Sequence, residues 1–384
     1  MLMQLRLITW VQTLTPLKAL QRFSRLSELL YPQPLSFDRT TWQPTPTPKS
    51  KLIPWYFLSF LCVLEGMSFY FILFQQILSH QKDPEISGTI HILLLILSIG
   101  YSFSTTIFFE YHTNVDEICF VIRNTLKFKD QLNESSTLPG LFFHGIISFI
   151  VMVPLGGFVV MILRPKVDPT YLWFRNVTII SCEMKLFFRL CLYCSTLLHV
   201  SVLIFGLAII GVNIIVPILR SLERPISSNY ECRSFLNVSK YITRTRTYRQ
   251  LQIITQVINQ LVRHILLVGA LILVLSAAML GFMVIKMAWK IPFALVFLAV
   301  TVIGAILGFV QIGFSSMADV MRKSADFKRD LEFQGGYISY RKRQLRSLKV
   351  LKIWVGSYFF IHKGTRIELF GLIAYHTMSL VISV

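Results

Sequence analysis

Residues 356–384 read GSYFFIHKGTRIELFGLIAYHTMSLVISV, an apolar segment that carries polar residues at regular spacing. A helix with about 100° between residues would gather one polar stripe. Its members are Thr365, Glu368, Leu372, Tyr375, His376, Ser379 and Ser383. Because polar side chains are costly in hydrocarbon, such a stripe needs protein partners or a water-filled path.

The composition of the whole chain places this segment in a membrane. Hydrophobic residues make up 54% of the 384 residues and charged residues only 15%, which is outside the range of soluble domains. Runs long enough to cross about 30 Å of hydrocarbon lie near residues 53–78, 89–109, 140–163, 193–219, 264–287, 292–317 and 366–384. The sequence therefore predicts an all-α, seven-transmembrane helical membrane protein.

The distribution of basic residues predicts the orientation of these spans. Lys and Arg are concentrated in residues 1–51, 220–262 and 318–365, and cytoplasmic segments carry such an excess. No cleavable signal peptide is predicted before the first span. We therefore expect an intracellular N-terminus and, with seven spans, an extracellular C-terminus. A G-protein-coupled receptor would need the opposite orientation, together with an acidic-Arg-Tyr triplet and an NPxxY-like last span that this chain lacks.

Four regions follow from this plan. Residues 1–52 are predicted as a cytoplasmic amphipathic surface helix and a Pro/Thr-rich linker, and residues 53–317 as six spans with an outer ligand pocket. Residues 318–365 are predicted as a cytoplasmic helical anchor, in which 340–355 form a basic amphipathic helix, and residues 366–384 as the terminal helix. Cytoplasmic helices of this kind either pack together or lie on lipid, and composition leaves both readings open.

Several functional classes have no support in the sequence. The net charge of +19 comes from basic residues beside hydrophobic spans, so anionic lipid is the expected partner and nucleic acid is not. No phosphate-binding loop, HExxH or nucleophile elbow is present, so no enzyme and no cofactor are predicted. No metal site is predicted either, because Cys191 and Cys194 lack a His or a second Cys pair nearby.

One glycosylation site is expected. Of three sequons, Asn176 falls in the second outer loop, whereas Asn133 and Asn237 would face the cytoplasm. Only Asn176 should therefore carry a glycan.

Ionisable residues inside the spans are scattered. They are Glu65, His91, His144 and His199, whereas a transporter should show paired charges or two matching halves. We expect His144 and His199 to be satisfied by hydrogen bonds. Glu65 could snorkel, pair with a neighbouring span or shape a ligand cavity.

The closing segment contains a short motif. Gly356, the aromatic pair Phe359 and Phe360, and the polar turn 362–364 precede a last helix that carries Ala374-Tyr375. This order resembles the insect gustatory and odorant receptor superfamily, whose gustatory members have Thr-Tyr at the latter position. The chain departs from the gustatory pattern at 381–382, where Val-Ile replaces Gln-Phe. It is similar to a divergent gustatory-receptor-like member.

The resemblance implies a ligand-gated nonselective cation channel in the plasma membrane, built as a homo- or hetero-tetramer and opened by a small-molecule tastant or odorant. The implied pore-lining residues are Leu372, Tyr375, His376, Ser379, Leu380 and Ser383. Helical spacing alone, without the family resemblance, indicates the same face of the helix. A single helix per chain cannot enclose a pore, so the pore reading requires a symmetric oligomer. Packing of the stripe within its own subunit is the alternative reading of that face. A multi-pass transporter or a nonconducting scaffold of the same fold is the alternative function.

Ligand contacts are expected near the outer end of the fourth span. Receptor pockets are mostly apolar with a few polar groups that set orientation, and Tyr193, Ser195 and His199 are the candidates. Packing of these side chains against the second outer loop is the competing reading.

Overall fold

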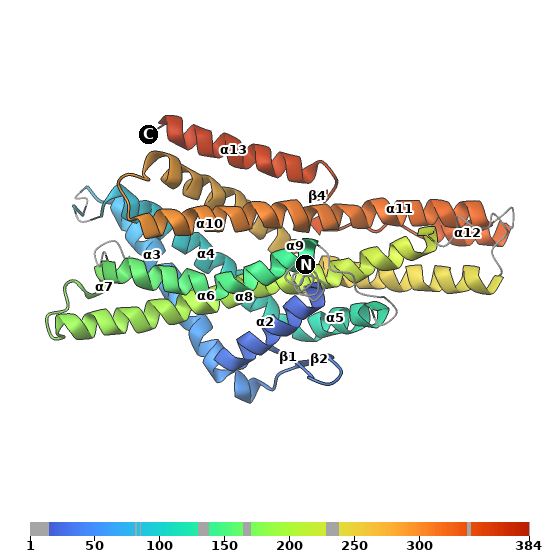
Figure 1. The fold of residues 1–384 in the computed structure, drawn as a ribbon, viewed down its shortest axis with the longest axis horizontal. Helices are drawn as coiled ribbons and strands as arrows, with labels where there is room; N and C mark the ends of the chain where they lie inside the picture. Colours follow the sequence, from blue (N-terminus) through green and yellow to red (C-terminus); the bar gives the residue numbers. More distant parts are fainter. Residues whose placement is uncertain are drawn as a thin grey trace, which may run out of the picture.

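The computed structural model describes residues 15–80, 83–84, 86–129, 138–163, 170–227, 238–335 and 339–383. Its long helices run side by side along the longest axis of the molecule (Figure 1). The short α7 (Tyr171–Phe174) and the C-terminal end of α13 (Thr365–Ser383) lie toward one end, at the left of Figure 1. Helices α11 (Ser315–Gly335) and α12 (Ser339–Ser347) lie at the other. We refer to these ends as outer and inner, following the orientation predicted from the basic residues.

Within the described residues, six helices are long and apolar enough to cross a membrane. They are α3 (Ile53–Leu78), α4 (Gly88–Thr113), α6 (Leu138–Leu163), α8 (Cys182–Ser227), α9 (Val238–Lys286) and α10 (Phe293–Phe309), the last of which continues through the π-helical turn η2 (Val310–Phe314) into α11. The all-α, multi-pass architecture is therefore confirmed, with two small hairpins added to it.

The seventh predicted span forms the 19-residue helix α13 but is not one of those six. Its first turn carries Arg366 and Glu368, and His376 with several hydroxyl residues follows. These polar residues lower the mean hydropathy of α13. The polar residues that mark this segment in the sequence therefore also distinguish it from the other spans.

Two helices extend well beyond a bilayer. α8 has 46 residues and α9 has 49, which corresponds to roughly 70 Å each at 1.5 Å per residue. Their inner parts pack with α11, α12 and α5 (Val115–Lys129) around a buried core. In that core the rings of Tyr248 and Phe327 stack with centroids 5.2 Å apart, and the Arg341 guanidinium lies 4.7 Å from the Tyr241 ring. The inner helices therefore pack against one another, as one of the two readings predicts.

The helix predicted for residues 340–355 is wrong beyond its first half. α12 ends at Ser347, and the chain continues extended into β3 (Trp354–Val355), which pairs antiparallel with β4 (Phe359–Phe360). Gly356 makes the turn between these strands with a φ of +59°, in the left-handed region that favours glycine. Its N–H donates to the Arg263 carbonyl at 2.9 Å.

Side chains of α9 hold this extended segment in place. The Tyr248 hydroxyl donates to the Lys349 carbonyl at 2.9 Å. Asn259 donates to the Lys352 carbonyl at 2.8 Å and accepts from the Trp354 N–H at 3.0 Å. These bonds satisfy backbone groups that a continuing helix would have satisfied internally.

The N-terminal region also differs from its prediction. Helix α2 (Pro16–Leu30) packs against α6 and α8 instead of lying free on a surface, and Leu20 and Phe23 are buried. Gly206 makes the close approach possible, because a Cβ there would lie 2.5 Å from the Phe23 ring. The predicted linker contains β2 (Pro44–Pro46), which pairs antiparallel with β1 (Leu35–Phe37).

Candidate functional site

Helix α13 packs on α9 through one face. The buried side chains of α13 are Thr365, Leu369, Ile373 and Thr377, spaced four residues apart. Spacing of this kind places them along one side of the helix. The surface of α13 opposite these residues is turned away from its own helix bundle.

The predicted pore-lining residues lie mainly on that exposed surface. Leu372 is 46% exposed and Tyr375 is 68% exposed. His376, Ser379 and Ser383 are also exposed, whereas Leu380 is half-buried. Packing within the subunit therefore does not account for the polar stripe. Thr365 is the member of the stripe that is buried.

The seam between α9 and α13 depends on a glycine. A Cβ at Gly281 would lie 2.9 Å from the Thr377 methyl carbon, closer than side chains normally approach. The Thr377 hydroxyl meanwhile donates to the Ile373 carbonyl of its own helix at 2.7 Å. The absent side chain at position 281 therefore sets how closely α13 approaches α9.

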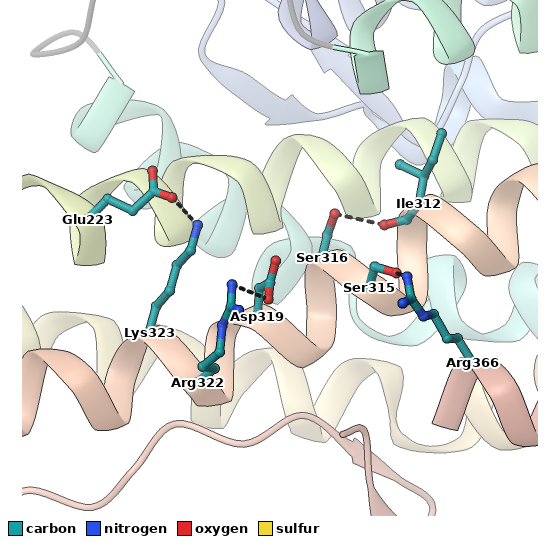
Figure 2. Close-up of polar contacts among 8 residues, drawn as sticks. All are labelled: Glu223, Ile312, Ser315, Ser316, Asp319, Arg322, Lys323 and Arg366. Atoms are coloured by element: carbon teal, nitrogen blue, oxygen red, sulfur yellow. Dashed lines mark hydrogen bonds and ion pairs between the residues drawn. The ribbon is translucent and has the colours of Figure 1, made fainter. Parts of the chain in front are cut away.

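A second contact joins the inner end of α13 to the sixth span. Figure 2 shows Arg366 reaching from α13 to Ser315, the residue that follows η2, with Nη1 donating to the hydroxyl at 3.1 Å. Ser316 bonds back to the Ile312 carbonyl within η2 at 2.8 Å. Further along α11, Lys323 pairs with Glu223 of α8. The π-helical turn thus lies where α13, α10 and the inner helices meet.

The start of α13 is capped by its own preceding turn. The Thr365 hydroxyl accepts from the His362 backbone N–H at 3.1 Å, and the Thr365 N–H donates to His362 Nδ1 at 3.1 Å. This exchange satisfies orphan backbone donors at a helix start. The polar turn of the sequence motif therefore has a local structural role.

A cavity of about 420 Å³ lies between α4, α6, α8, α9, α10 and the η2 region. Apolar side chains dominate its lining, and none of the lining residues is charged. Its polar side chains are Tyr101, Tyr193, Ser201, Ser276 and Ser316. Size and composition are those of a site for an apolar small molecule.

The structure separates the three candidate ligand contacts. Tyr193 lines the cavity, whereas Ser195 and His199 are not among its lining residues. The Ser195 hydroxyl donates to the Leu192 carbonyl of its own helix at 2.9 Å. The inner part of the cavity, which reaches Ile353, had no signal in the sequence.

His199 is satisfied by residues distant in the sequence, as expected. Its Nδ1 lies 2.7 Å from the Tyr31 hydroxyl and its Nε2 lies 2.9 Å from the Ser59 hydroxyl. Burial raises the pKa of the Tyr31 phenol, so Tyr31 stays protonated and can donate. His144 likewise has a partner, because Arg22 donates to its Nδ1 at 3.1 Å.

Glu65 pairs with a neighbouring span. The carboxylate is 2% exposed, and its Oε2 accepts a hydrogen bond from the Thr196 hydroxyl at 2.8 Å. The Tyr101 hydroxyl lies 3.0 Å from the same Thr196 oxygen. Since Tyr101 lines the cavity, this buried chain of hydrogen bonds connects the cavity wall to α3.

The sequons lie in different parts of the chain. Asn176 is exposed, next to α7. Asn133 and Asn237 lie outside the described residues. Among the described residues, no group of three or more His, Cys, Asp or Glu side chains could hold a metal ion.

The fold is that of the insect olfactory receptors. The chain superposes on olfactory receptor OR5 from Machilis hrabei in complex with eugenol with a TM-score of 0.67 and 11% identity, over 96% of this chain and 98% of that one. A second structure of the same receptor gives a TM-score of 0.64 and 10% identity, over 98% of both chains. No protein-family model and no curated protein matches the sequence.

The protein is an all-α, multi-pass membrane protein with an internal apolar cavity and a C-terminal helix docked on the outside of its bundle. Within that class it has the insect olfactory receptor fold, so the resemblance predicted from the sequence is confirmed at the level of the fold.

Proposed function

We propose that this protein is a chemosensory receptor of the insect gustatory and odorant receptor superfamily, acting as a ligand-gated nonselective cation channel in the plasma membrane. The observation that carries the proposal is the exposed polar stripe on α13. Tyr375, His376, Ser379 and Ser383 are presented to the outside of the bundle, while α9 covers a different face of the helix.

A polar face exposed at membrane depth needs a partner. Four α13 helices around a symmetry axis would enclose a water-filled path and give the stripe its solvent. Leu372 and Leu380 would add aliphatic constrictions that close by dewetting. The outer half of α13 contains no Asp or Glu, which favours weak discrimination among cations, and Glu368 at the inner end would attract them.

The cavity supports a gating route. Leu280 and Met283 of α9 line the cavity, and Gly281 between them contacts Thr377 of α13. A ligand in the cavity that shifts α9 would therefore also move α13, because α9 contacts both the cavity and α13. We propose Tyr193 as a direct ligand contact. Ser195 and His199 would act through the packing of α8.

The test is whole-cell current with surface labelling. Ser379→Trp and Tyr375→Ala are compared with wild type during application of a tastant and odorant panel, and Met378→Trp is the matched control. Met378 is 53% exposed but lies about 100° away from Ser379 around the helix. We expect the two stripe variants to change permeability or block current and Met378→Trp to leave permeation unchanged.

The decisive contrary result has two parts. If surface-delivered protein gives no current with the panel and purified particles are monomeric, the channel proposal is wrong. A transporter or a nonconducting scaffold of this fold would then be the remaining function.

A further inference from the structure

The cavity is long as well as apolar. Lining residues occur on α8 from Tyr193 to Ile215, on α9 from Ile258 to Met283, and on the α10–η2–α11 helix from Leu295 to Met317. At 1.5 Å per residue, each stretch is roughly 33 to 38 Å. Three neighbouring helices therefore follow the cavity from the outer end of the bundle to the inner helices.

Polarity is uneven along this length. Tyr193 and Ser201 of α8 and Ser276 of α9 lie toward the outer end of their lining stretches. Further inward, the lining of α8 and α9 is apolar, and Ile353 of the extended segment before β3 contributes to the wall. Ser316 is the polar side chain at the inner end, and its hydroxyl already donates to the Ile312 carbonyl.

We propose that the cavity binds an extended, unbranched aliphatic chain with one uncharged polar head group. The head lies at the level of Ser201 and Ser276, and the tail points inward toward Ile215 and Ile353. An uncharged head follows from the lining, which contains no charged residue to compensate a buried ion. This inference deepens the proposed function, and the role of the chain as a stimulus rests on that proposal.

The geometry fixes the length of the chain. From Ser201 to Ile215, α8 rises roughly 21 Å. An extended peptide backbone covers about 3.5 Å over three bonds, so an alkyl chain covers about 1.2 Å per bond. About 17 or 18 bonds, those of an alcohol with about 17 carbon atoms, fill the distance. A compact odorant would occupy only part of such a cavity.

Two glycines provide a matched pair of variants. Gly211 lines the inner cavity, and no heavy atom lies within 4 Å of the Cβ it lacks. A Cβ at this position therefore meets no neighbour, and Gly211→Leu extends a side chain from a residue of the cavity wall. Gly145 of α6 has the same open surroundings but is exposed and does not line the cavity. Gly145→Leu is the control for replacing a helical glycine.

The experiment is photo-affinity labelling of the full-length protein in nanodiscs. The probe is hexadecan-1-ol with a diazirine on the last carbon, and labelled residues are identified by mass spectrometry. We expect labels near the inner lining, at Ile215, Ile258 or Met317. In Gly211→Leu this labelling should fall about tenfold or more, because the leucine overpacks the space of the tail. In Gly145→Leu it should stay within about twofold of wild type, because position 145 does not line the cavity.

Unlabelled competitors test length and charge. Gly211 lies roughly 15 Å inward of Ser201, a distance that about 12 carbons span. Decan-1-ol should therefore compete equally well against wild type and Gly211→Leu, whereas hexadecan-1-ol should lose potency against the variant. Hexadecanoate should compete about tenfold less well than hexadecan-1-ol, since its carboxylate lacks a cationic partner in the lining.

The aliphatic molecule could be a free ligand or a neutral lipid of the bilayer. Extraction and mass spectrometry of the purified protein identify the molecule that the cavity retains. A neutral single-chain molecule that is present in wild type and reduced in Gly211→Leu supports the proposal, whereas a retained phospholipid would overturn it, because the lining holds no partner for a charged head group. Labels confined to lipid-facing residues, or equal labelling of the two glycine variants, would overturn the proposal.

The outcome is separable from that of the proposed function. Labelling requires no current, so inner labels on a protein that never conducts would refute the channel and keep the aliphatic site. A current evoked by compact odorants, without inner labelling, would do the reverse.

Discussion

The contact between Gly281 and Thr377 gives the sharpest prediction. Gly281→Ala places a methyl group 2.9 Å from the Thr377 methyl carbon and 3.2 Å from its hydroxyl oxygen. Both groups lie in the seam between two helices, so the extra volume has to be accommodated by moving α13 or changing the Thr377 rotamer. We predict that Gly281→Ala weakens the docking of α13 on α9.

The expected size follows from two opposing terms. Overpacking a well-packed site costs about 1–3 kcal/mol, and replacing glycine with alanine inside a helix gains up to about 1 kcal/mol. Gly304 of α10 supplies the control, because it is helical and exposed and has no heavy atom within 4 Å of its absent Cβ. Gly304→Ala brings the same gain in helix propensity as Gly281→Ala, without a clash. The difference between the two variants should therefore be about 1–3 kcal/mol.

The assay measures local opening of the seam. Ile373 of α13 is 8% exposed, so in Ile373→Cys a maleimide reacts at this position only when the helix undocks. Adding Gly281→Ala should raise the site-specific labelling rate by roughly 5- to 150-fold, the equivalent of 1–3 kcal/mol. Adding Gly304→Ala should leave the rate unchanged.

A compensating change tests the cause. Thr377→Ser removes the methyl carbon that Gly281→Ala would approach, so the double variant should return most of the way to the original labelling rate. Equal rates for Gly281→Ala and Gly304→Ala would show that the seam is not closely packed. Failure of Thr377→Ser to restore the rate would show that the clash lies elsewhere.

Three further predictions concern other parts of the chain. Asn259→Ala leaves two backbone groups of the extended segment without their side-chain partner. It should destabilise the inner helices by about 1–3 kcal/mol, measured by thermal unfolding. Asn124→Ala removes only an exposed hydrogen bond to the Phe120 carbonyl of its own helix and should have little effect. Burial, with a contribution from a neighbouring aspartate, raises the pKa of the Cys119 thiol to about 11, so at pH 8 iodoacetamide should label exposed Cys182 and leave Cys119 unmodified; equal labelling would contradict the burial of α5. Asn176→Gln should abolish the mobility shift that endoglycosidase produces on protein from a secretory cell, and a shift that persists would place another sequon outside.

Local patterns predicted most of the helices. The first span was predicted at residues 53–78, where α3 lies, because an apolar run flanked by polar residues is a signal contained within the segment itself. The inner part of α9 was predicted as a helix that enters the membrane without a break, and α9 is continuous from Val238 to Lys286. Helix α8 extends beyond its predicted span, residues 193–219, at both ends, because hydrophobic length marks only the part of a helix that can cross the bilayer. The 340–355 helix failed because its second half, LKVLKIWV, contains β-branched and aromatic residues that also suit a strand, and α9 supplies hydrogen bonds that hold the non-helical backbone.

The candidate site divides in the same way. The polar stripe of α13 could be derived from helical geometry, because it depends on one segment. The partners of His199 and Glu65 could not, since they come from the N-terminal region and from separate spans. The cavity wall is assembled from more than five elements, and an apolar residue on a span has the same local signature whether it faces lipid, a neighbouring helix or a cavity.

The sequence by itself determined that this protein is an α-helical membrane protein, where most of its spans lie and which face of its last helix is polar. Hydrophobic length and helical periodicity are properties of contiguous residues, so they need no knowledge of the rest of the chain. Only the tertiary structure decided which face of α13 is free, where the cavity runs and how the segment before α13 is held. Those features depend on distances between residues remote in the sequence, and packing selects among several arrangements that local preferences allow equally well.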